Sequence, residues 1–557
     1  MTDPLRYRNR LMWASFLTLV ASGVGFAVRA AMAGTWEAEF NIGVEFGAIM
    51  GAGFLGFGMM IFFGGILVEK FGYKSLLVIA FLLHLISAGM IFAAQPAYDA
   101  AIEQDPAAAT AAAFNILFWS TFLFSIAQGL YEAVINPMIA QLYPDNQTHY
   151  LNILHAGWPG GMIIGGLIAV CFVGQDAWVM PVDYWEVVLA GFAVIVVLYG
   201  AIAFSCPFPA TAAKKQKGNF AVLFSCFFSP VFLLLILLHA CVGYVELGVD
   251  SWVTKLMNNL MPNAILILIY TSFLMFILRF FAGPIVHRIN PIGLLLVSSI
   301  LACLGLLWLG SDIQSVVMIF AAATLYSLGK AFFWPTMLGV AGERYPQSGA
   351  IAMGALGAAG MLTVGLVAGS GIGYKQASNA SSYLAEASNS TFERYAEEKE
   401  KGLMIAIPTK IEMLGIPNIE IPIPVAKYRG LTPNITNAAN EVRRKEDGTL
   451  DTSAFAKLKE SLPAVAPDDA PDGQTKSDID DLLVTIEDDY PLVQTADLKG
   501  GRRALTMTAA VPAAMAVGFL ILLGYFAATG GYKKLVVNDD GEVVEHGHKA
   551  SKPKPNT

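Results

Sequence analysis

Long apolar runs dominate the chain, and short polar gaps separate them. Each run has about 20 residues, the length that a helix needs to cross a hydrocarbon core of roughly 30 Å. The first half contains the runs 11–33, 46–68, 76–94, 114–139, 151–174 and 184–204. The second half contains the runs 230–253, 264–286, 294–310, 316–340, 349–372 and 505–528. The pattern predicts an all-α, polytopic membrane protein with about twelve transmembrane helices in two six-helix bundles.

The composition agrees with a protein that lipid surrounds. Of the 557 residues, 55% are hydrophobic and 14% are charged, and the mean hydropathy is +0.57. A soluble globule could not bury so much apolar surface. The net charge of -8 arises largely in one polar segment and the C-terminal tail, so we expect no nucleic-acid partner. The five cysteines have neither a disulfide framework nor metal-ligand spacing, and we expect no metal or cofactor.

Basic residues in the short loops determine the predicted orientation. If the N-terminus is cytoplasmic, the cytoplasmic loops contain Arg6, Arg8, Arg10, Lys70, Lys74, Lys214, Lys215, Lys217, Arg288 and Arg344. The opposite loops contain only Lys255. Because Lys and Arg collect on the cytoplasmic side, both termini are predicted to be cytoplasmic. The first run has no cleavage site, so we expect a retained helix, and short loops favour a bacterial inner (plasma) membrane.

The runs divide the chain into six predicted regions. They are an N-terminal six-helix bundle (1–210), a cytoplasmic linker (211–229), helices seven to eleven (230–372), an extracytoplasmic insertion (373–503), helix twelve (504–530) and a disordered cytoplasmic tail (531–557). The insertion is polar and rich in Pro, Ala and charged residues. It has two interpretations, a tolerated loop or a lid or docking module.

Two internal echoes relate the halves. The segment "GGILVEKFGYKSLL" after the second run is echoed by "AGPIVHRINPIGLLL" after the eighth, with Gly65 matching Gly283 and Lys70 matching Arg288. The segment "GLYEAVINPMIAQLYP" has a looser counterpart in "LGKAFFWPTMLGVAGERYP". The halves therefore look like a duplication, which predicts pseudo-symmetric bundles.

These segments also carry a resemblance to a known family. "GGILVEKFGYK" resembles the Gly-x-Leu-x-Asp-Arg-x-Gly-x-Arg/Lys loop motif of the major facilitator superfamily, with Glu69 in the usual place of Asp. "GLYEAVINPMIAQLYPDNQTHYLNILHAGWPGG" resembles the Gly-x-x-Glu-x-x-x-Asn-Pro region of its fucose, galactose and glucose proton symporter branch. "SLGKAFFWPTML" and "GAIAMGALGAAGML" resemble helices ten and eleven of that branch. The resemblance covers most of the chain except the insertion, and it implies the major facilitator fold.

The loop motif predicts a gate. An acid at the end of one helix and bases at the start of the next can clamp neighbouring helices through charge-assisted hydrogen bonds. We therefore assign gating to Gly65, Glu69, Lys70, Gly72, Lys74 and Arg288.

Two charged residues within the apolar runs are the main candidates for function. Glu132 lies in the fourth run, where an ionised carboxylate is costly unless it is paired or wet. The resemblance implies that Glu132 couples transport to protons. The alternative is an ion pair that locks helices, with Arg29 of the first run as its obvious partner. An arginine keeps its proton, so Arg29 could instead hold an anionic group of the solute.

Other polar and aromatic residues are predicted to line the solute cavity. Glu246 and Asp250 are four residues apart, share one helical face and precede Trp252, although they could instead lie at the membrane interface. Arg279 and Lys330 could bind solute, pair with these acids or extend toward an interface.

The remaining candidates lie near helix irregularities. Asn136 precedes a proline that frees a backbone carbonyl, and Trp334 occupies the comparable place in the second half. Trp158 precedes glycines, and its ring could stack on a sugar. His155 could also bind solute or be a hydrogen-bonded core histidine.

The leading hypothesis is a monomeric secondary transporter that moves a small polar solute, a sugar or sugar-like molecule, by proton-coupled alternating access within membrane lipid. One alternative is transport of a small organic anion or sugar acid that Arg29 binds. Another is a non-transporting membrane solute sensor. The chain has no nucleotide-binding loop, so we expect neither an enzyme nor a pump that ATP drives directly.

Overall fold

The computed structural model describes residues 4–42, 46–173, 179, 184–215, 220–252, 265–401, 426–445, 449–461, 476–537 and 542–545. Within these residues, eleven helical segments are long and apolar enough to cross a membrane. The remaining expected span, 264–286, corresponds to the shorter apolar helix Leu266–Arg279, which follows residues outside the described ranges. The predicted all-α membrane fold is confirmed.

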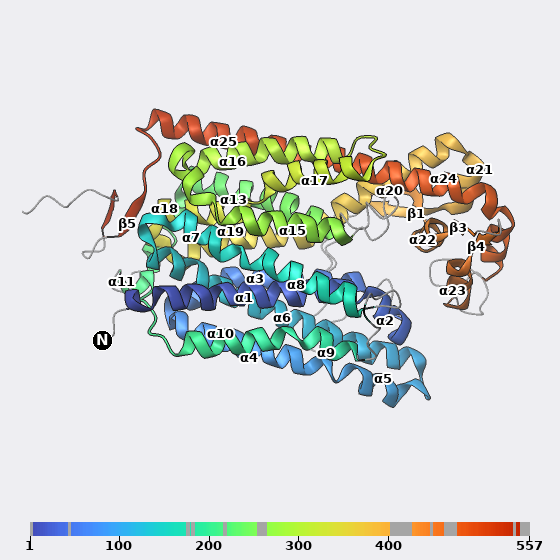
Figure 1. The fold of residues 1–557 in the computed structure, drawn as a ribbon, viewed down its shortest axis with the longest axis horizontal. Helices are drawn as coiled ribbons and strands as arrows, with labels where there is room; N and C mark the ends of the chain where they lie inside the picture. Colours follow the sequence, from blue (N-terminus) through green and yellow to red (C-terminus); the bar gives the residue numbers. More distant parts are fainter. Residues whose placement is uncertain are drawn as a thin grey trace, which may run out of the picture.

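The first bundle forms one layer of the molecule and the second bundle the other (Figure 1). The first bundle contains η1 (Pro4–Tyr7), α1 (Arg8–Ala31), α2 (Ala33–Phe40), α3 (Phe46–Phe71), α4 (Tyr73–Ile91), α5 (Ala94–Ile102), α6 (Pro106–Leu142), η2 (Pro144–Asn146), α7 (Gln147–His155), α8 (Gly157–Phe172), α9 (Trp185–Ala190) and α10 (Phe192–Phe204). The linker region contains α11 (Ala212–Lys215), α12 (Phe220–Leu223) and η3 (Ser225–Phe228).

The second bundle repeats this arrangement. It contains α13 (Pro230–Gly243), the π-helix η4 (Tyr244–Gly248), α15 (Ile265–Arg279), α16 (Ala282–Leu309), α17 (Val316–Lys330), α18 (Phe333–Arg344), η5 (Pro346–Ser348), α19 (Gly349–Thr363), the π-helix η6 (Val364–Ala368) and α25 (Ala510–Ala528). The bundles meet along two seams, where α3 packs on α19 and where α7 and α8 pack on α15 and α18. A small cavity that residues of both bundles line, the central cavity, lies between these seams.

The turn between the eighth and ninth spans lies at Asn290, in the expected gap between the runs 264–286 and 294–310. Helix α16 begins at Ala282, after a turn at residues 280–281, and it kinks at Asn290, where φ is +54°. Asn tolerates this left-handed conformation better than most residues, and the following Pro291 is suited to the first turn of a helix. The first bundle makes its corresponding turn at Gly72, where φ is +89°. Both turns lie seven residues after the matched glycines, Gly65 and Gly283, which supports the duplication.

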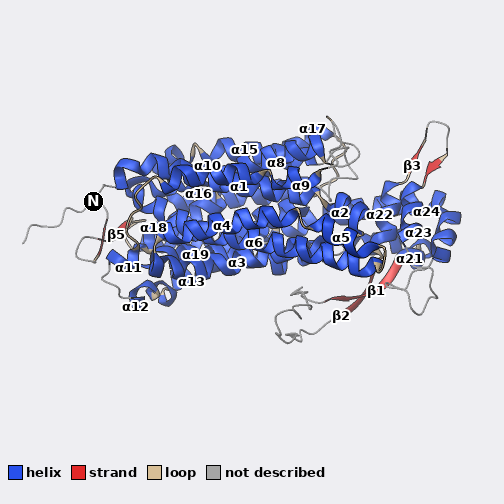
Figure 2. Cartoon of the chain, turned by 90° about the horizontal axis from the view of Figure 1, so that it is seen from below, coloured by secondary structure: helices blue, strands red, loops and turns tan. Residues whose placement is uncertain are grey.

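The insertion folds as a packed module at the end of the bundle opposite the N-terminus (Figures 1 and 2). It contains α20 (Gly369–Ala387), α21 (Asn389–Tyr395), β1 (Ala396–Lys401), β2 (Ala426–Leu431), α22 (Pro433–Glu441), β3 (Arg443–Arg444), β4 (Leu450–Asp451), α23 (Ser453–Ser461) and α24 (Lys476–Thr508). Strands β1 and β2 pair antiparallel, as do β3 and β4. Leu384, Tyr395, Ile435, Phe455 and Ile479 belong to a separate apolar core. The described part is therefore more than a flexible loop.

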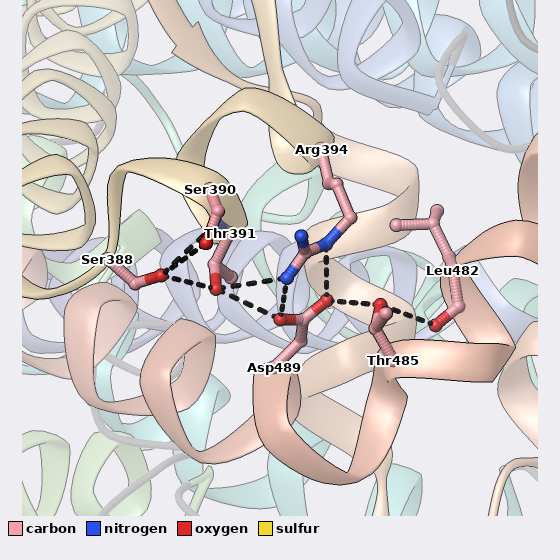
Figure 3. Close-up of polar contacts among 7 residues, drawn as sticks. All are labelled: Ser388, Ser390, Thr391, Arg394, Leu482, Thr485 and Asp489. Carbon is pink, nitrogen blue, oxygen red and sulfur yellow. Dashed lines mark hydrogen bonds and ion pairs between the residues drawn. The ribbon is translucent and has the colours of Figure 1, made fainter.

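A buried carboxylate ties two helices of this module together (Figure 3). Asp489 of α24 accepts hydrogen bonds from Thr391 Oγ1 at 2.9 Å, Thr485 Oγ1 at 2.7 Å and Arg394 Nε at 2.9 Å. Ser388 Oγ caps α21 by accepting a hydrogen bond from the Thr391 amide at 3.2 Å. The network fixes α21 on α24.

We expect Asp489→Asn to destabilise this module by about 2 kcal/mol, because hydrogen bonds to a charged group are worth roughly 1.5–3 kcal/mol. Thermal unfolding with limited proteolysis of the module would measure the loss. Asp480→Asn is the matched control, since the Asp480–Lys459 ion pair is exposed and such pairs contribute roughly 0–1 kcal/mol. Equal stability of the two variants would contradict the assigned role of Asp489.

The tail differs from its prediction. Residues 531–557 were expected to be disordered, yet β5 (Leu535–Val537) and β6 (Val543–Glu545) form an antiparallel hairpin with Leu535 opposite Glu545. The reason is visible in "LVVNDDGEVVE", where two β-branched runs flank a turn-forming Asp-Gly pair. Residues 546–557 lie outside the described ranges.

Candidate functional site

A small cavity between the bundles brings six of the predicted site residues together. The first bundle contributes Glu132, His155 and Trp158, and the second contributes Glu246, Arg279 and Trp334. Phe57, Leu247 and Met361 complete the lining. The cavity volume is ≈ 30 Å³. Because one water molecule needs about 10–15 Å³ by this measure, the cavity has room for water but not for a sugar.

A chain of hydrogen bonds begins at Glu132. This residue of α6 is 4% exposed, and its Oε2 accepts a hydrogen bond from Asn136 Nδ2, one helical turn further on, at 3.2 Å. Asn136 Oδ1 lies 2.9 Å from His155 Nε2. An amide oxygen can only accept, so His155 is the donor and carries a proton on Nε2. The Glu-x-x-x-Asn-Pro spacing thus places Asn136 between the acid and the histidine.

Arg279 connects three helix interruptions. Its Nη2 donates to Glu246 Oε1 in η4 at 2.7 Å, its Nη1 donates to the carbonyl of His155 at the end of α7 at 2.6 Å, and its Nε donates to the carbonyl of Ala331 after α17 at 2.7 Å. Backbone carbonyls at helix ends lack helical partners, so a guanidinium satisfies them well. Arg279 is 1% exposed and therefore pairs inside the protein and does not extend to an interface. It joins both bundles.

A sequence profile described as Major Facilitator Superfamily matches residues 12–369. The chain belongs to this superfamily. Among solved structures, the proton:xylose symporter XylE bound to 6-bromo-6-deoxy-D-glucose matches with TM-score 0.56 and 15% identity, over 66% of this chain and 88% of that chain. XylE from E. coli in its inward-open conformation matches with TM-score 0.51 and 18% identity, over 66% and 89%. The E. coli fucose:proton symporter FucP matches with TM-score 0.48 and 18% identity, over 66% and 90%.

At these identities the two XylE matches show a shared fold alone. No curated protein matches the chain. As a member of the superfamily, the chain has the two-bundle architecture that its sequence resemblance implied. The superfamily comprises membrane transporters. Membership does not identify the solute, which depends on the residues that line this chain's own cavity.

Arg29 does not pair with Glu132, contrary to one interpretation of the sequence. Its Nη1 donates to the carbonyl of Gly25 at 3.1 Å, its Nη2 lies 3.4 Å from Ser87 Oγ, and its guanidinium lies over the ring of Phe124 at 3.9 Å. Arg29 is 1% exposed, and its Nε has no partner. Within the described residues no carboxylate forms an ion pair with it. It lines an adjoining cavity of ≈ 20 Å³ together with Gln128.

The second buried ion pair joins Lys330 of α17 to Asp250, beyond η4. The Lys330 side chain is fully buried, and its ammonium lies 4.9 Å from the centre of the Tyr326 ring. Asp250 borders a third small cavity, of ≈ 20 Å³, beside Trp158 and Glu246. Trp252 was expected to line the same cavity. Its ring instead packs against Gly373 of α20.

The superfamily's loop motif forms a latch in this chain. Glu69 Oε1 accepts a hydrogen bond from the Ala350 amide at 3.0 Å, and Oε2 accepts one from the Ala213 amide at 2.8 Å. The carboxylate therefore holds the N-terminus of α19, where the helix dipole favours a negative charge. Gly65 permits this approach, since a Cβ there would lie 2.8 Å from the Ala350 carbonyl.

The basic residues of the motif lie outside this latch. Lys74 Nζ donates to the carbonyl of Phe204 at 3.3 Å, within the first bundle. Lys70 is exposed, with its ammonium 5.3 Å from the centre of the Phe71 ring. Arg288 is also exposed. Gating by these three residues therefore stays a prediction, whereas Glu69 contacts both the second bundle and the linker.

A buried acid at the seam between the bundles was absent from the sequence-based candidates. Glu343 of α18 is fully buried and accepts hydrogen bonds from Thr148 Oγ1 of the first bundle at 2.9 Å and from Tyr532 of the tail at 2.8 Å. Nearby, Asn152 Nδ2 donates to Thr336 Oγ1 at 3.1 Å across the same seam. The internal echo contained the signal, because "GERYP" aligns Glu343 with Gln141 of "AQLYP".

Proposed function

We propose that this chain is a proton-coupled secondary transporter that moves a small polar, sugar-like solute by alternating access. The observation that carries the proposal is the cavity between the bundles, with Glu132 on one side and the Arg279–Glu246 pair on the other. Groups from both bundles face a shared space near the middle of the spans. A solute bound there is exposed to opposite sides when the bundles rock.

Glu132 is the acid best suited to carry the proton. Glu246 and Asp250 each form an ion pair, with Arg279 and Lys330 respectively, so protonating either would leave a buried cation uncompensated. In the described part of the chain Glu132 forms no ion pair, and Asn136 donates to it. It can therefore gain or lose a proton without breaking such a pair.

The small cavity fits a closed stage of the transport cycle. A volume of ≈ 30 Å³ is well below the 300–1,000 Å³ that is typical of small-molecule sites. The Glu69 latch and the Thr148–Glu343 hydrogen bond hold the two bundles together at the end that bears the N-terminus. Solute binding would require the bundles to part at one end.

Uptake into proteoliposomes tests the proposal. Vesicles with an imposed pH gradient, acidic outside, would be offered xylose, fucose, glucose and galactose. We expect accumulation of at least one sugar, and a protonophore should abolish it. If the protonophore leaves accumulation unchanged, proton coupling is contradicted. If no sugar enters the vesicles, the assignment of a sugar as the solute is contradicted.

A small organic anion, such as a sugar acid, is a second candidate solute. The observation that favours it is Arg29, a buried cation that lines a cavity and has no carboxylate partner within the described residues. Burying an uncompensated charge is costly, so a bound carboxylate would supply the missing counter-ion.

If this second candidate is correct, Arg29→Gln should reduce galacturonate uptake at least tenfold, because the amide cannot replace a charged, bidentate donor. Uptake in proteoliposomes would measure the change. Arg503→Gln is the matched control, since Arg503 is exposed and has no assigned role in the site or the gate. Undiminished galacturonate uptake by Arg29→Gln would exclude this role for Arg29.

A further inference from the structure

A second, larger cavity lies between the bundles, and residues of β5 line it. Strand β5 lies at the end of the molecule that bears the N-terminus (Figure 1). We name this cavity the terminal chamber. Its volume is ≈ 350 Å³, against ≈ 30 Å³ for the central cavity. Its lining includes residues of both bundles and of the tail: Gln141, Gln147, Tyr345, Met353, Val536 and Val537. A volume above roughly 300 Å³ lies in the range of small-molecule sites.

The terminal chamber lies next to the hydrogen-bonded group at the central cavity. Asn136 forms hydrogen bonds with Glu132 and His155, and the next residue of α6, Pro137, lines the chamber. A solute that leaves the central cavity on this side would therefore meet the chamber next. The chamber also borders the Glu69 latch, because Ala212 and Gly349 line it and precede the two residues whose amides donate to Glu69.

The tail hairpin is fastened over the terminal chamber by contacts with both bundles. Tyr532 donates to Glu343 Oε2 at 2.8 Å, and Lys534 Nζ lies 3.3 Å from Glu343 Oε1. Lys534 Nζ also donates to the carbonyl of Asp145, in the first bundle, at 3.3 Å. From the second bundle, Arg344 Nη1 donates to the carbonyl of Lys533 at 2.7 Å. These contacts place Val536 and Val537 of β5 in the chamber wall.

The polar groups of the chamber indicate the chemistry of its occupant. The described residues that line it include no charged side chain. Gln141 donates its amide hydrogen to Tyr73, and its buried Oε1 has no partner. Gln147 is 6% exposed, and its Oε1 is also unpartnered. Each of these oxygens is covered by protein, so its side chain has to rotate toward the chamber before a ligand can donate to it. A lining that has amide groups and no charge favours a neutral ligand that carries hydroxyl groups.

We propose that the terminal chamber is an exit site that holds a neutral, hydroxyl-bearing solute, and that the β5–β6 hairpin is its lid. The identity of the solute rests on the proposed function. The role of the hairpin as a lid is independent of it. Because the hairpin bridges the bundles, it has to detach from at least one of them before the chamber opens. The tail thus adds a closure that lies beyond the Glu69 latch.

Thiol labelling tests the lid. A cysteine would replace Ala140, which lines the chamber, in a chain whose five native cysteines are changed to alanine. In detergent micelles, we expect a polar maleimide to label this cysteine at least tenfold faster when the chain is truncated after Gly531. The milder pair Tyr532→Phe and Lys534→Ala, which keeps the hairpin, should give an intermediate rate. Thermal unfolding would verify that each variant is folded.

Protection by solute tests the site. Xylose, fucose and glucose would be added to the truncated variant, and we expect any sugar that wild-type vesicles accumulate to slow labelling at least threefold. Gln147→Leu should remove this protection, whereas Gln314→Leu, at an exposed position far from the chamber, should not. Equal labelling of full-length and truncated chains, or no protection by an accumulated sugar, would overturn the proposal. Failure of the proposed function would appear separately, as absent accumulation by the wild type.

Discussion

Glu132→Gln should reduce proton-driven accumulation of solute at least 100-fold and leave exchange of solute across the membrane intact. Glutamine matches the size of glutamate and still offers an oxygen to Asn136, so the cavity should keep its shape. It cannot take up or release a proton in the physiological range, and the cycle then loses its link to the pH gradient. Uptake under a gradient and counterflow without one would separate the two activities.

Glu103→Gln is the matched control for this experiment, because Glu103 follows the last residue of α5 and is exposed. It should accumulate solute at the wild-type rate. If Glu132→Gln still accumulates solute against its gradient, another group carries the proton. In that case the assignment of coupling to Glu132 is wrong, although the fold and the cavity stand.

Arg279→Met should cause the largest loss of stability. The variant leaves Glu246 buried without its cation, and breaking a buried pair in this way costs roughly 3–5 kcal/mol. The carbonyls of His155 and Ala331 also lose their donor. We expect a clear fall in the unfolding temperature and little folded protein after extraction, which fluorescence-detected size exclusion would measure.

A second substitution separates stability from transport. Arg279→Met combined with Glu246→Leu removes both charges, and apolar pairs often replace buried ion pairs at little cost. We expect the double variant to regain most of the lost stability but no transport, because the cavity has lost both groups. Arg503→Met, on the surface, should change neither. A single Arg279→Met variant with wild-type stability would show that the three contacts contribute little.

The fold was predictable because lipid imposes a strict length on each span. Runs of apolar residues had to be helices, and the polar gaps between them had to lie outside the hydrocarbon core. The group formed by Glu132, Asn136, His155 and Trp158 was also predictable, since these residues share one contiguous stretch that resembles a known branch. Both inferences rely on local pattern, which a sequence displays directly.

Contacts between distant helices were harder to predict. The sequence offered Arg29 as a partner for Glu132, but pairing depends on which faces two helices turn toward each other, and Arg29 lies on the ring of Phe124. The π-helix around Glu246 has no strong local signal. The tail hairpin had a signal, the Asp-Gly turn, which the charge and polarity of the surrounding segment outweighed.

The module formed by the insertion is continuous with two helical segments of the second bundle. The helical segment Pro346–Ala387 leads into it and the segment Asp478–Ala528 leads out, and α20 packs along α24. At 1.5 Å per residue, the 19 residues of α20 extend the segment by about 30 Å beyond η6 and form a lever. Rigid-body tilting of the second bundle would be magnified at the lever's tip. A fluorophore pair, one dye on α23 and one on α5, should therefore report each turnover as a change in energy transfer, without any label inside the membrane.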